Sequence, residues 1–432
     1  MVRQVFTGSM IHADENGEVI FKESVTILVE DGQIVDVTEN PDQQKIDAFH
    51  ADEVNNLSPG QFIIPGFIDC HIHAVQFPNL GLGYDKTLLD WLETYTFPLE
   101  RQYTSQELAE KVFEVVVKRT IQTGTTTACY FASLYTEASA ILGQKCSQFG
   151  QRAFIGKVNM NDPRDDGYYE TTEKSIETTK AFIEAIDKIA DPLVKPIITP
   201  RFALSCDLDL MKQLAEIAKE KDLHIQSHVS ENKDEIKAVK EKFGLATYTD
   251  VYETAGLLTN KTILAHGVYL EDSELSTLAK TGTAIIHCPT SNLNLKSGLC
   301  DVRRLKANNV NVGIGTDVSG GSSYNILDEI RSVLHVSNAV SFSSTGDYVP
   351  LDYKDVFTMA TLGSAKALSI EDKVGNFMPG KEFDALVIDS NAENSLLDNF
   401  TDYTLEENLQ RFIYSGNDHN IVSVYVKGRK VK

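Results

Sequence analysis

Short β-rich runs alternate with longer helical segments through the middle of this chain, from about residue 125 to residue 317. The helical segments carry apolar residues at three- and four-residue spacing, as in 107–122, 173–188, 208–221 and 273–280. Such alternation predicts parallel strands joined by crossover helices. With an earlier apolar run, eight strands are expected, at 62–68, 125–131, 152–160, 194–202, 223–229, 262–267, 283–289 and 311–317. We therefore expect an α/β protein with a closed (β/α)₈ barrel of the TIM type, which takes up about 250 residues or more.

The two ends of the chain carry a different pattern. Residues 27–35 are typical of a strand, an Asp-Gly turn and a second strand, and residues 424–431 are typical of another hairpin. The turn-rich stretch 374–380 favours a return from barrel to sheet. We therefore predict one small, β-sandwich-like domain built from both termini. The predicted boundaries are 1–65 and 371–432 for this composite domain and 66–370 for the barrel.

Charge and hydropathy narrow the range of partners. The formal charge of −22 repels phosphate backbones and no basic stripe counters it, so we expect no nucleic-acid partner. No apolar stretch approaches the roughly 18–20 residues that cross a bilayer, so we expect no membrane association. The six cysteines form no C-x-x-C pair, and the first residues lack the apolar core of a signal peptide. These features indicate a cytosolic protein with reduced thiols.

Histidines and acids stand where the predicted barrel strands end. They are His71 and His73 after the first strand, His228 and Glu231 after the fifth, His266 at the sixth and Asp317 at the eighth. The active sites of such barrels gather at the C-terminal ends of the strands. A single histidine at such a point is more often a hydrogen-bonded core or loop residue. Four of the ten histidines at strand ends favour one shared site.

These side chains suit one zinc ion. His71 and His73 are two residues apart, so a strand would direct both side chains to the same face. With His228 and Asp317 they offer three imidazole nitrogens and a carboxylate, and water would complete the shell. A bound divalent ion lowers the pKa of such a water towards about 7.

The remaining groups fit acid and base roles around the metal. Asp317 can also accept a proton from the water, Glu231 is placed as a proton shuttle, and His266 can hydrogen-bond the nucleophile or the charge that develops. Hydrolases of this fold that hold two metals usually bridge them with a modified lysine at the end of the fourth strand. Here that strand ends at Arg201, and Lys195 lies near its start. We therefore expect one metal.

Several stretches of the sequence resemble the mononuclear amidohydrolase superfamily. They are Pro-Gly-Phe-Ile-Asp-Cys-His-Ile-His at 65–73, His-Val-Ser-Glu at 228–231, Ala-His-Gly at 265–267 and Gly-Thr-Asp at 315–317. Further stretches, at 74–76, 91–98, 124–131, 199–206, 224–228 and 287–292, resemble the members of this superfamily that act on guanine. The similarity covers essentially the whole barrel.

The resemblance implies zinc-dependent hydrolysis of guanine to xanthine and ammonia in cytosolic purine catabolism, by a homodimer with one zinc per chain. It implies that Arg201 donates to the 6-oxo group, that Gln76 donates and accepts along the purine edge, and that Phe202 covers a ring face. The full set of substrate-binding residues that it implies is Gln76, Arg201, Phe202, His228, Glu231 and Asp317.

Three alternatives remain. The barrel could deaminate another aminopurine or hydrolyse a triazine with the same metal set. A non-catalytic assembly protein could use the same barrel, although such proteins typically lack the metal ligands that are present here. Arg201 could pair with an acidic residue on the barrel rim instead of contacting a substrate.

Overall fold

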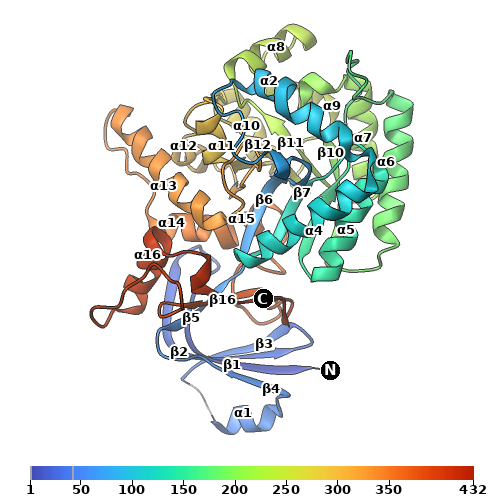
Figure 1. Cartoon of the computed structure of the whole chain (residues 1–432). Helices are drawn as coiled ribbons and strands as arrows, with labels where there is room; N and C mark the ends of the chain where they lie inside the picture. Colours follow the sequence, from blue (N-terminus) through green and yellow to red (C-terminus); the bar gives the residue numbers. More distant parts are fainter. Residues whose placement is uncertain (1, 41–42) are drawn as a thin grey trace.

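The computed structural model describes residues 2–40 and 43–432, which form a helix-covered barrel and a smaller sheet (Figure 1). The barrel sheet runs in the order β6-β7-β8-β10-β11-β12-β13-β14, with parallel ladders throughout, and a short β9 pairs with β10. The predicted α/β barrel is therefore confirmed. Its strands are β6 (Phe67–His73), β7 (Thr125–Phe131), β8 (Arg152–Gly156), β9 (Val158–Asn159), β10 (Val194–Pro200), β11 (His224–Val229), β12 (Thr262–His266), β13 (Ala284–His287) and β14 (Val312–Ile314).

The second sheet draws its strands from both ends of the chain, as predicted. Its order is β17-β16-β15-β5-β1-β2-β3, and β4 pairs with β1. Both chain ends lie at this sheet, below the barrel in Figure 1. The strands are β1 (Arg3–Ala13), β2 (Val19–Glu30), β3 (Gln33–Glu39), β4 (Glu53–Asn56), β5 (Gln61–Pro65), β15 (Ala385–Asp389), β16 (Ile421–Val426) and β17 (Arg429–Lys430).

Three predicted strands differ most from the observed ones. The apolar run 62–68 belongs to two strands, because β5 ends at Pro65 in the terminal sheet and β6 begins at Phe67 in the barrel. The run 152–160 is divided between β8 and β9, which pair with different parts of β10. The last strand, expected to reach residue 317, already ends at Ile314. Asp317 itself has φ of 46°, in the left-handed region, so it cannot continue an extended strand.

The barrel closes at its C-terminal rim. Among the described residues no ladder joins β14 to β6, so the closure is less complete than the predicted closed sheet. The backbone N–H of Asp317 donates to the carbonyl of His71 (2.8 Å), and the N–H of His73 donates to the carbonyl of Val318 (3.0 Å). These two hydrogen bonds join the first strand to the loop that follows the last strand, at the level of the predicted site.

Helices cover the outside of the barrel, and the four predicted helical segments are present (Figure 1). Ser105 accepts a hydrogen bond from the backbone of Leu108 and so caps the first of them, α4. The helices after the first barrel strand are α2 (Leu88–Trp91), α3 (Phe97–Glu100), α4 (Gln106–Gln122), α5 (Thr136–Phe149), α6 (Thr172–Asp187), α7 (Leu208–Glu220), α8 (Lys233–Phe243), α9 (Tyr248–Ala255), α10 (Asp272–Thr281), α11 (Pro289–Asn294), α12 (Val302–Ala307), α13 (Ile326–Ser343), α14 (Tyr353–Thr358), α15 (Ser364–Ala367) and α16 (Leu405–Ser415), and α1 (Gln43–Phe49) belongs to the terminal part.

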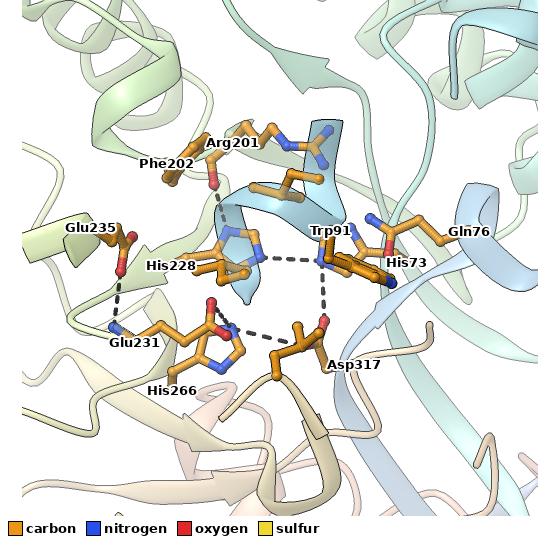
Figure 2. Close-up of a pocket in the computed structure, with 13 residues that line it drawn as sticks. His73, Gln76, Trp91, Arg201, Phe202, His228, Glu231, Glu235, His266 and Asp317 are labelled. Atoms are coloured by element: carbon orange, nitrogen blue, oxygen red, sulfur yellow. Dashed lines mark hydrogen bonds and ion pairs between the residues drawn. The ribbon is translucent and has the colours of Figure 1, made fainter. Parts of the chain in front are cut away.

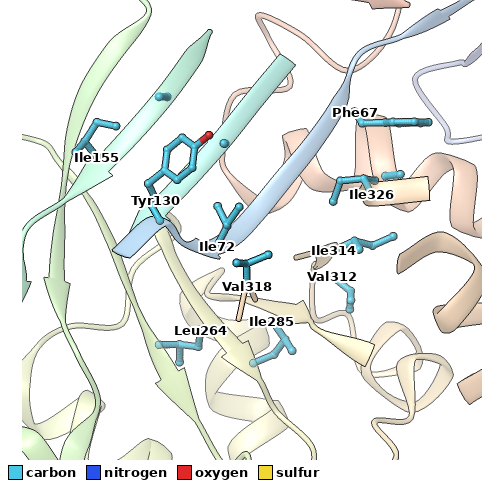
Figure 3. Close-up of a cluster of buried hydrophobic side chains, with 14 of the residues drawn as sticks. Phe67, Ile72, Tyr130, Ile155, Leu264, Ile285, Val312, Ile314, Val318 and Ile326 are labelled. Carbon is cyan, nitrogen blue, oxygen red and sulfur yellow. The ribbon is translucent and has the colours of Figure 1, made fainter. Parts of the chain in front are cut away.

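Alternating strand residues supply two separate buried clusters. Tyr130 and Ile155 belong to the large cluster between strands and helices, together with Leu264 and Ile285 (Figure 3). Their neighbours along the strands, such as Cys129, belong to a second cluster with Ile68 and Ile286. This alternation is the two-residue period of a strand that is buried on both faces. Both faces of the barrel strands are therefore packed, which gives the site a rigid base.

We expect Arg152→Ala to lower the thermal stability markedly, because Arg152 joins the barrel to the terminal sheet. Its side chain, 8% exposed, donates to the Asp384 carboxylate at 3.0 Å and also pairs with Glu382 at 2.7 Å. Removing one partner of a buried pair typically costs about 3–5 kcal/mol. The control is Lys118→Ala, which breaks an exposed pair with Glu114. A thermal midpoint as high for Arg152→Ala as for Lys118→Ala would contradict this prediction.

No helix in the described part of the chain is long and apolar enough to cross a bilayer. The six cysteines all lie in that part, where they are buried and free of disulfides.

Candidate functional site

The first barrel strand directs two histidines to the rim. The pairing of β6 with β7 is irregular between Asp69 and Ile72. Ile72 therefore packs in a different buried cluster from Ile68 and Cys70. Ile72 packs in the core between strands and helices, whereas His71 and His73 lie with their Nε2 atoms 3.2 Å apart. Both imidazoles are almost fully buried. The prediction that these two residues converge is confirmed.

The loop after β14 brings Asp317 beside them. A side chain at Gly315 would meet the Cβ atom of His71 at 2.7 Å, so only glycine allows this approach. The buried carboxylate of Asp69 accepts hydrogen bonds from the backbone N–H groups of His71 and Thr316, both at 3.1 Å, and from the Thr316 hydroxyl at 2.6 Å. Asp69 thus ties the loop that carries Asp317 to the strand that carries the histidines.

Four potential metal-ligand atoms lie close together, at the ends of β6 and β11 and in the loop after β14. Figure 2 shows three of these side chains, His73, His228 and Asp317. The Nε2 atom of His73 is 3.1 Å from Nε2 of His228, and Oδ1 of Asp317 is 3.2 Å from Nε2 of His71 and 3.3 Å from Nε2 of His73. Ligand atoms at about 2.0–2.1 Å from one zinc ion lie about 2.9–3.6 Å from their neighbours when a fifth position is left for water. These distances are compatible with one ion held by the four side chains.

The protonation states also suit metal binding. Burial lowers the pKa of His73 to about 4 and lowers the pKa of His228 well below its usual value. Both rings are therefore neutral at physiological pH. The Nδ1–H of His228 donates to the carbonyl of Arg201 at 2.5 Å, which leaves the Nε2 lone pair free. Burial raises the pKa of Asp317, but its hydrogen bonds to His71 and His73 outweigh this effect and hold the pKa well below the usual range.

His266 stands at the edge of this donor set. One ligand atom each from His71, His228, His266 and Asp317 lie within 4.8 Å of one another. The Nε2 atom of His266 is 3.8 Å from Asp317 and 3.4 Å from Glu231, longer than the distances that His73 makes, so His73 is the better fourth donor. The Nδ1 atom of His266 contacts the side-chain oxygen of Asn292 at 2.9 Å.

The lysine that would bridge two metals is not at the rim. Lys195 is exposed near the start of β10, at the opposite end from the site. Arg201 stands at the rim end, directly after the strand. The geometry therefore fits a single metal.

Glu231 lies beside the donor set and is nearly fully buried. Burial raises the pKa of its carboxyl group to about 8, and the neighbouring charge of Asp317 adds to the shift. Ser297 donates to one of its oxygens at 3.0 Å. The backbone N–H of Glu231 donates to the carboxylate of Glu235 at 3.1 Å, across the first turn of α8. This carboxyl group can hold a proton near neutral pH, as a general acid and base requires.

Arg201 and Gln76 form the opposite wall. The Arg201 guanidinium is buried and forms a bidentate ion pair with Glu100. Arg201 therefore does pair with an acidic residue, as one alternative expected, and this pair lies beside the cavity. A guanidinium has five N–H donors, so the contact with Glu100 leaves further N–H groups for a substrate. Gln76 donates to Glu100 at 2.9 Å, and Phe202 lines the same cavity.

A cavity lies between these walls. Eight of the nine predicted site residues line it, and the ninth, His71, lies behind His73 in the donor set. Its other lining residues are Leu88, Trp91, Leu92, Glu235 and Leu295. None of these five was predicted as a site residue, although Trp91 and Leu92 begin the stretch 91–98 that carries part of the resemblance. The sequence could have indicated a structural role for Glu235, because it stands three residues after the helix cap Asn232, which is the spacing of a capping box.

Comparison with known proteins shows the family of the chain and its individual relatives. The profile of the amidohydrolase family matches residues 62–431, so the chain belongs to the amidohydrolase family. The curated guanine deaminases of Mus musculus and Dictyostelium discoideum are 44% and 43% identical to it, over 99% of this chain and 96% and 98% of theirs. The crystal structure of a guanine deaminase from C. acetobutylicum, with bound guanine in the active site, is similar with a TM-score of 0.92, at 35% identity over all of both chains.

Proposed function

We propose that the protein is an enzyme that hydrolyses guanine to xanthine and ammonia. The observation that carries the proposal is a cavity with two different walls. One wall carries Glu231 and side chains whose spacing suits a metal ion, and the other carries the hydrogen-bonding groups of Arg201 and Gln76. The relatives that resemble this chain over nearly its whole length are guanine deaminases, which supports guanine as the substrate.

The proposed cofactor is one zinc ion per chain, held by His71, His73, His228 and Asp317. The spacing of their donor atoms and the neutral imidazoles support this set. When bound, the metal makes hydroxide available near neutral pH by lowering the pKa of water.

The chain's own groups handle the protons. The carboxyl group of Glu231 is proposed to donate a proton to N3 of guanine as C2 is attacked. The resulting carboxylate then takes the proton of the new hydroxyl group on C2 and passes it to the departing amine. The raised pKa of Glu231 favours the protonated form that the first step needs. Asp317 accepts the proton of the attacking water and returns it to Glu231 after the amine has left, which restores the starting protonation states. His266, whose Nδ1 atom contacts Asn292, hydrogen-bonds the oxygen at the reacting carbon.

The far wall is proposed to select the base. With C2 facing the donor set, the 6-oxo group and the imidazole nitrogens face Arg201, Gln76 and Phe202. Arg201 donates to the oxo group, Gln76 binds along the purine edge, and Phe202 covers a ring face. Adenine lacks the 6-oxo group and would leave a buried donor unpaired, at a cost of roughly 1–3 kcal/mol.

We expect Arg201→Ala to lower kcat/KM for guanine by at least an order of magnitude, because the oxo group loses a charged donor. Metal content should stay at the wild-type level, since Arg201 contacts the donor set only through its backbone carbonyl. The control is Arg119→Ala, at an exposed position of α4. Unchanged guanine turnover in Arg201→Ala would show that Arg201 is structural.

The reaction itself is tested by following oxygen. Hydrolytic deamination takes the new oxygen of xanthine from water, so a reaction in ¹⁸O-labelled water should give xanthine with one labelled oxygen and one equivalent of ammonia. Mass spectrometry of the purine product and an ammonia assay measure both. The absence of xanthine, or xanthine formed without the label, would exclude the proposed reaction.

We infer in addition a homodimer that acts in cytosolic purine catabolism, with no nucleic-acid or membrane partner. Similarity to guanine deaminases along the whole chain supports this inference, and the charge of −22 disfavours anionic partners. Sedimentation equilibrium of the purified chain tests the dimer, and a single species with the mass of one chain would exclude it.

A further inference from the structure

Glu100 lies behind the wall that is proposed to read the purine edge. It ends α3, in the segment 88–104 that follows β6, and its side chain is 1% exposed. Within the described residues it accepts two hydrogen bonds from Arg201, one from Gln76 at 2.9 Å and one from the Tyr168 hydroxyl at 3.0 Å. These donors saturate a carboxylate that does not itself line the cavity.

The first consequence concerns the charge and plane of Arg201. Burial raises the pKa of Glu100, but the Arg201 guanidinium outweighs this effect and holds the pKa below its usual value, so the pair is ionised. The bidentate contact fixes the guanidinium plane. The ring of Phe97, also from the segment 88–104, lies 4.8 Å from the guanidinium carbon. A neutral, oriented ion pair thus faces the cavity in place of an uncompensated cation.

The second consequence concerns the Gln76 amide. An amide group can be turned over without changing its shape, which exchanges its donor and its acceptor. Here the NH₂ group of Gln76 donates to Glu100, and its oxygen accepts from the backbone N–H of Ser319 at 3.3 Å. A carboxylate can only accept, so Glu100 determines which way the Gln76 amide faces.

We propose that Glu100 is a positioning residue for substrate selection, which fixes the hydrogen-bond donors that Arg201 and Gln76 present to the oxo-bearing edge of the purine. The inference rests on the proposed function, because it names the residue that orients the side chains proposed to recognise guanine. Glu100 acts through Arg201 and Gln76 and does not touch the reacting atoms.

A purely structural role for Glu100 makes a different prediction. If it only anchored the segment 88–104 to the barrel, its loss would disturb all ligands of the cavity alike. If it positions the hydrogen-bond donors for the oxo group, its loss lowers kcat/KM for guanine and leaves the binding of a base without that group unchanged. 2-Aminopurine is such a base, since it keeps the 2-amino group and the ring nitrogens and lacks the 6-oxo group.

The test measures kcat/KM for guanine and the inhibition constant of 2-aminopurine as a competing base, in Glu100→Gln and Glu100→Asp. Glutamine keeps the shape but removes the charge, and aspartate keeps the charge but draws it back from Arg201. We expect at least a tenfold fall in kcat/KM for guanine in Glu100→Gln and a smaller fall in Glu100→Asp. The inhibition constant of 2-aminopurine should change less than about twofold. The matched control is Glu93→Gln, an exposed carboxylate of the same segment that pairs with Arg164.

Equal losses for guanine and 2-aminopurine, or no loss for guanine, would overturn the inference. If the Glu100 variants do not fold, Tyr168→Phe removes one of the four hydrogen bonds to Glu100. This variant should lower kcat/KM for guanine more than it weakens the binding of 2-aminopurine. Equal effects on the two bases would also overturn the inference. Wild-type protein that forms no xanthine would instead refute the proposed function, so the two failures are distinct.

Discussion

We expect Glu231→Gln to lower kcat for guanine by about 10²- to 10⁴-fold, the usual size of lost general acid–base help. Glutamine keeps the shape of the side chain and can still accept from Ser297, but it cannot give up and take back a proton. Glu231 does not belong to the donor set, so metal content should stay near the wild-type value. Steady-state kinetics and metal analysis on the same sample measure both quantities.

The matched control is Glu253→Gln, an exposed carboxylate on α9, which should leave both values unchanged. A Glu231→Gln protein that had lost its metal together with its activity would show that the residue supports the metal site and does not transfer protons. A variant with normal metal and normal kcat would remove Glu231 from the mechanism altogether.

Alanine at His228 should have the largest effect. His228 supplies one of the donor atoms, and its Nε2 lies 3.1 Å from that of His73. We expect metal content to fall from about one ion per chain towards zero and guanine turnover to fall to background. The thermal midpoint should fall too, because metal binding free energy is linked to folding. Alanine at His71, His73 or Asp317 should behave in the same way.

The control for this series is His335→Ala, which replaces an exposed histidine on α13. Chelation of the wild-type protein should abolish activity, and one equivalent of zinc should restore it. Full activity after exhaustive chelation, or two tightly held ions per chain, would contradict the single-metal site.

The strand ends were predictable because two independent patterns agree there. Apolar periodicity locates the barrel strands, and histidines or acids follow the same runs, so the convergence of His71, His73, His228 and Asp317 could be expected from the sequence. The end of β5 was not predictable in this way. The run 62–68 contains Pro65-Gly66, a dipeptide typical of turns, at the point where β5 ends and β6 begins. This signal marks a break, but it does not show that the two halves belong to different sheets.

The far wall shows a second limit of sequence analysis. Arg201 could be singled out because it follows a barrel strand, but its partner Glu100 lies 101 positions earlier in the chain. Glu100 stands in a short helix after a strand, where no periodicity separates a buried acid from an exposed one. Only the fold brings it to Arg201, Gln76 and Tyr168.

Release of ammonia from a panel of amino-substituted bases tests the central claim most directly. Purified, metal-loaded protein is incubated with guanine, adenine, cytosine, adenosine and ammeline, and kcat/KM is measured for each. The account predicts ammonia from guanine, with the other four at or near background. Adenine, adenosine or ammeline turned over as fast as guanine would contradict it and favour a different aminopurine or triazine as the substrate.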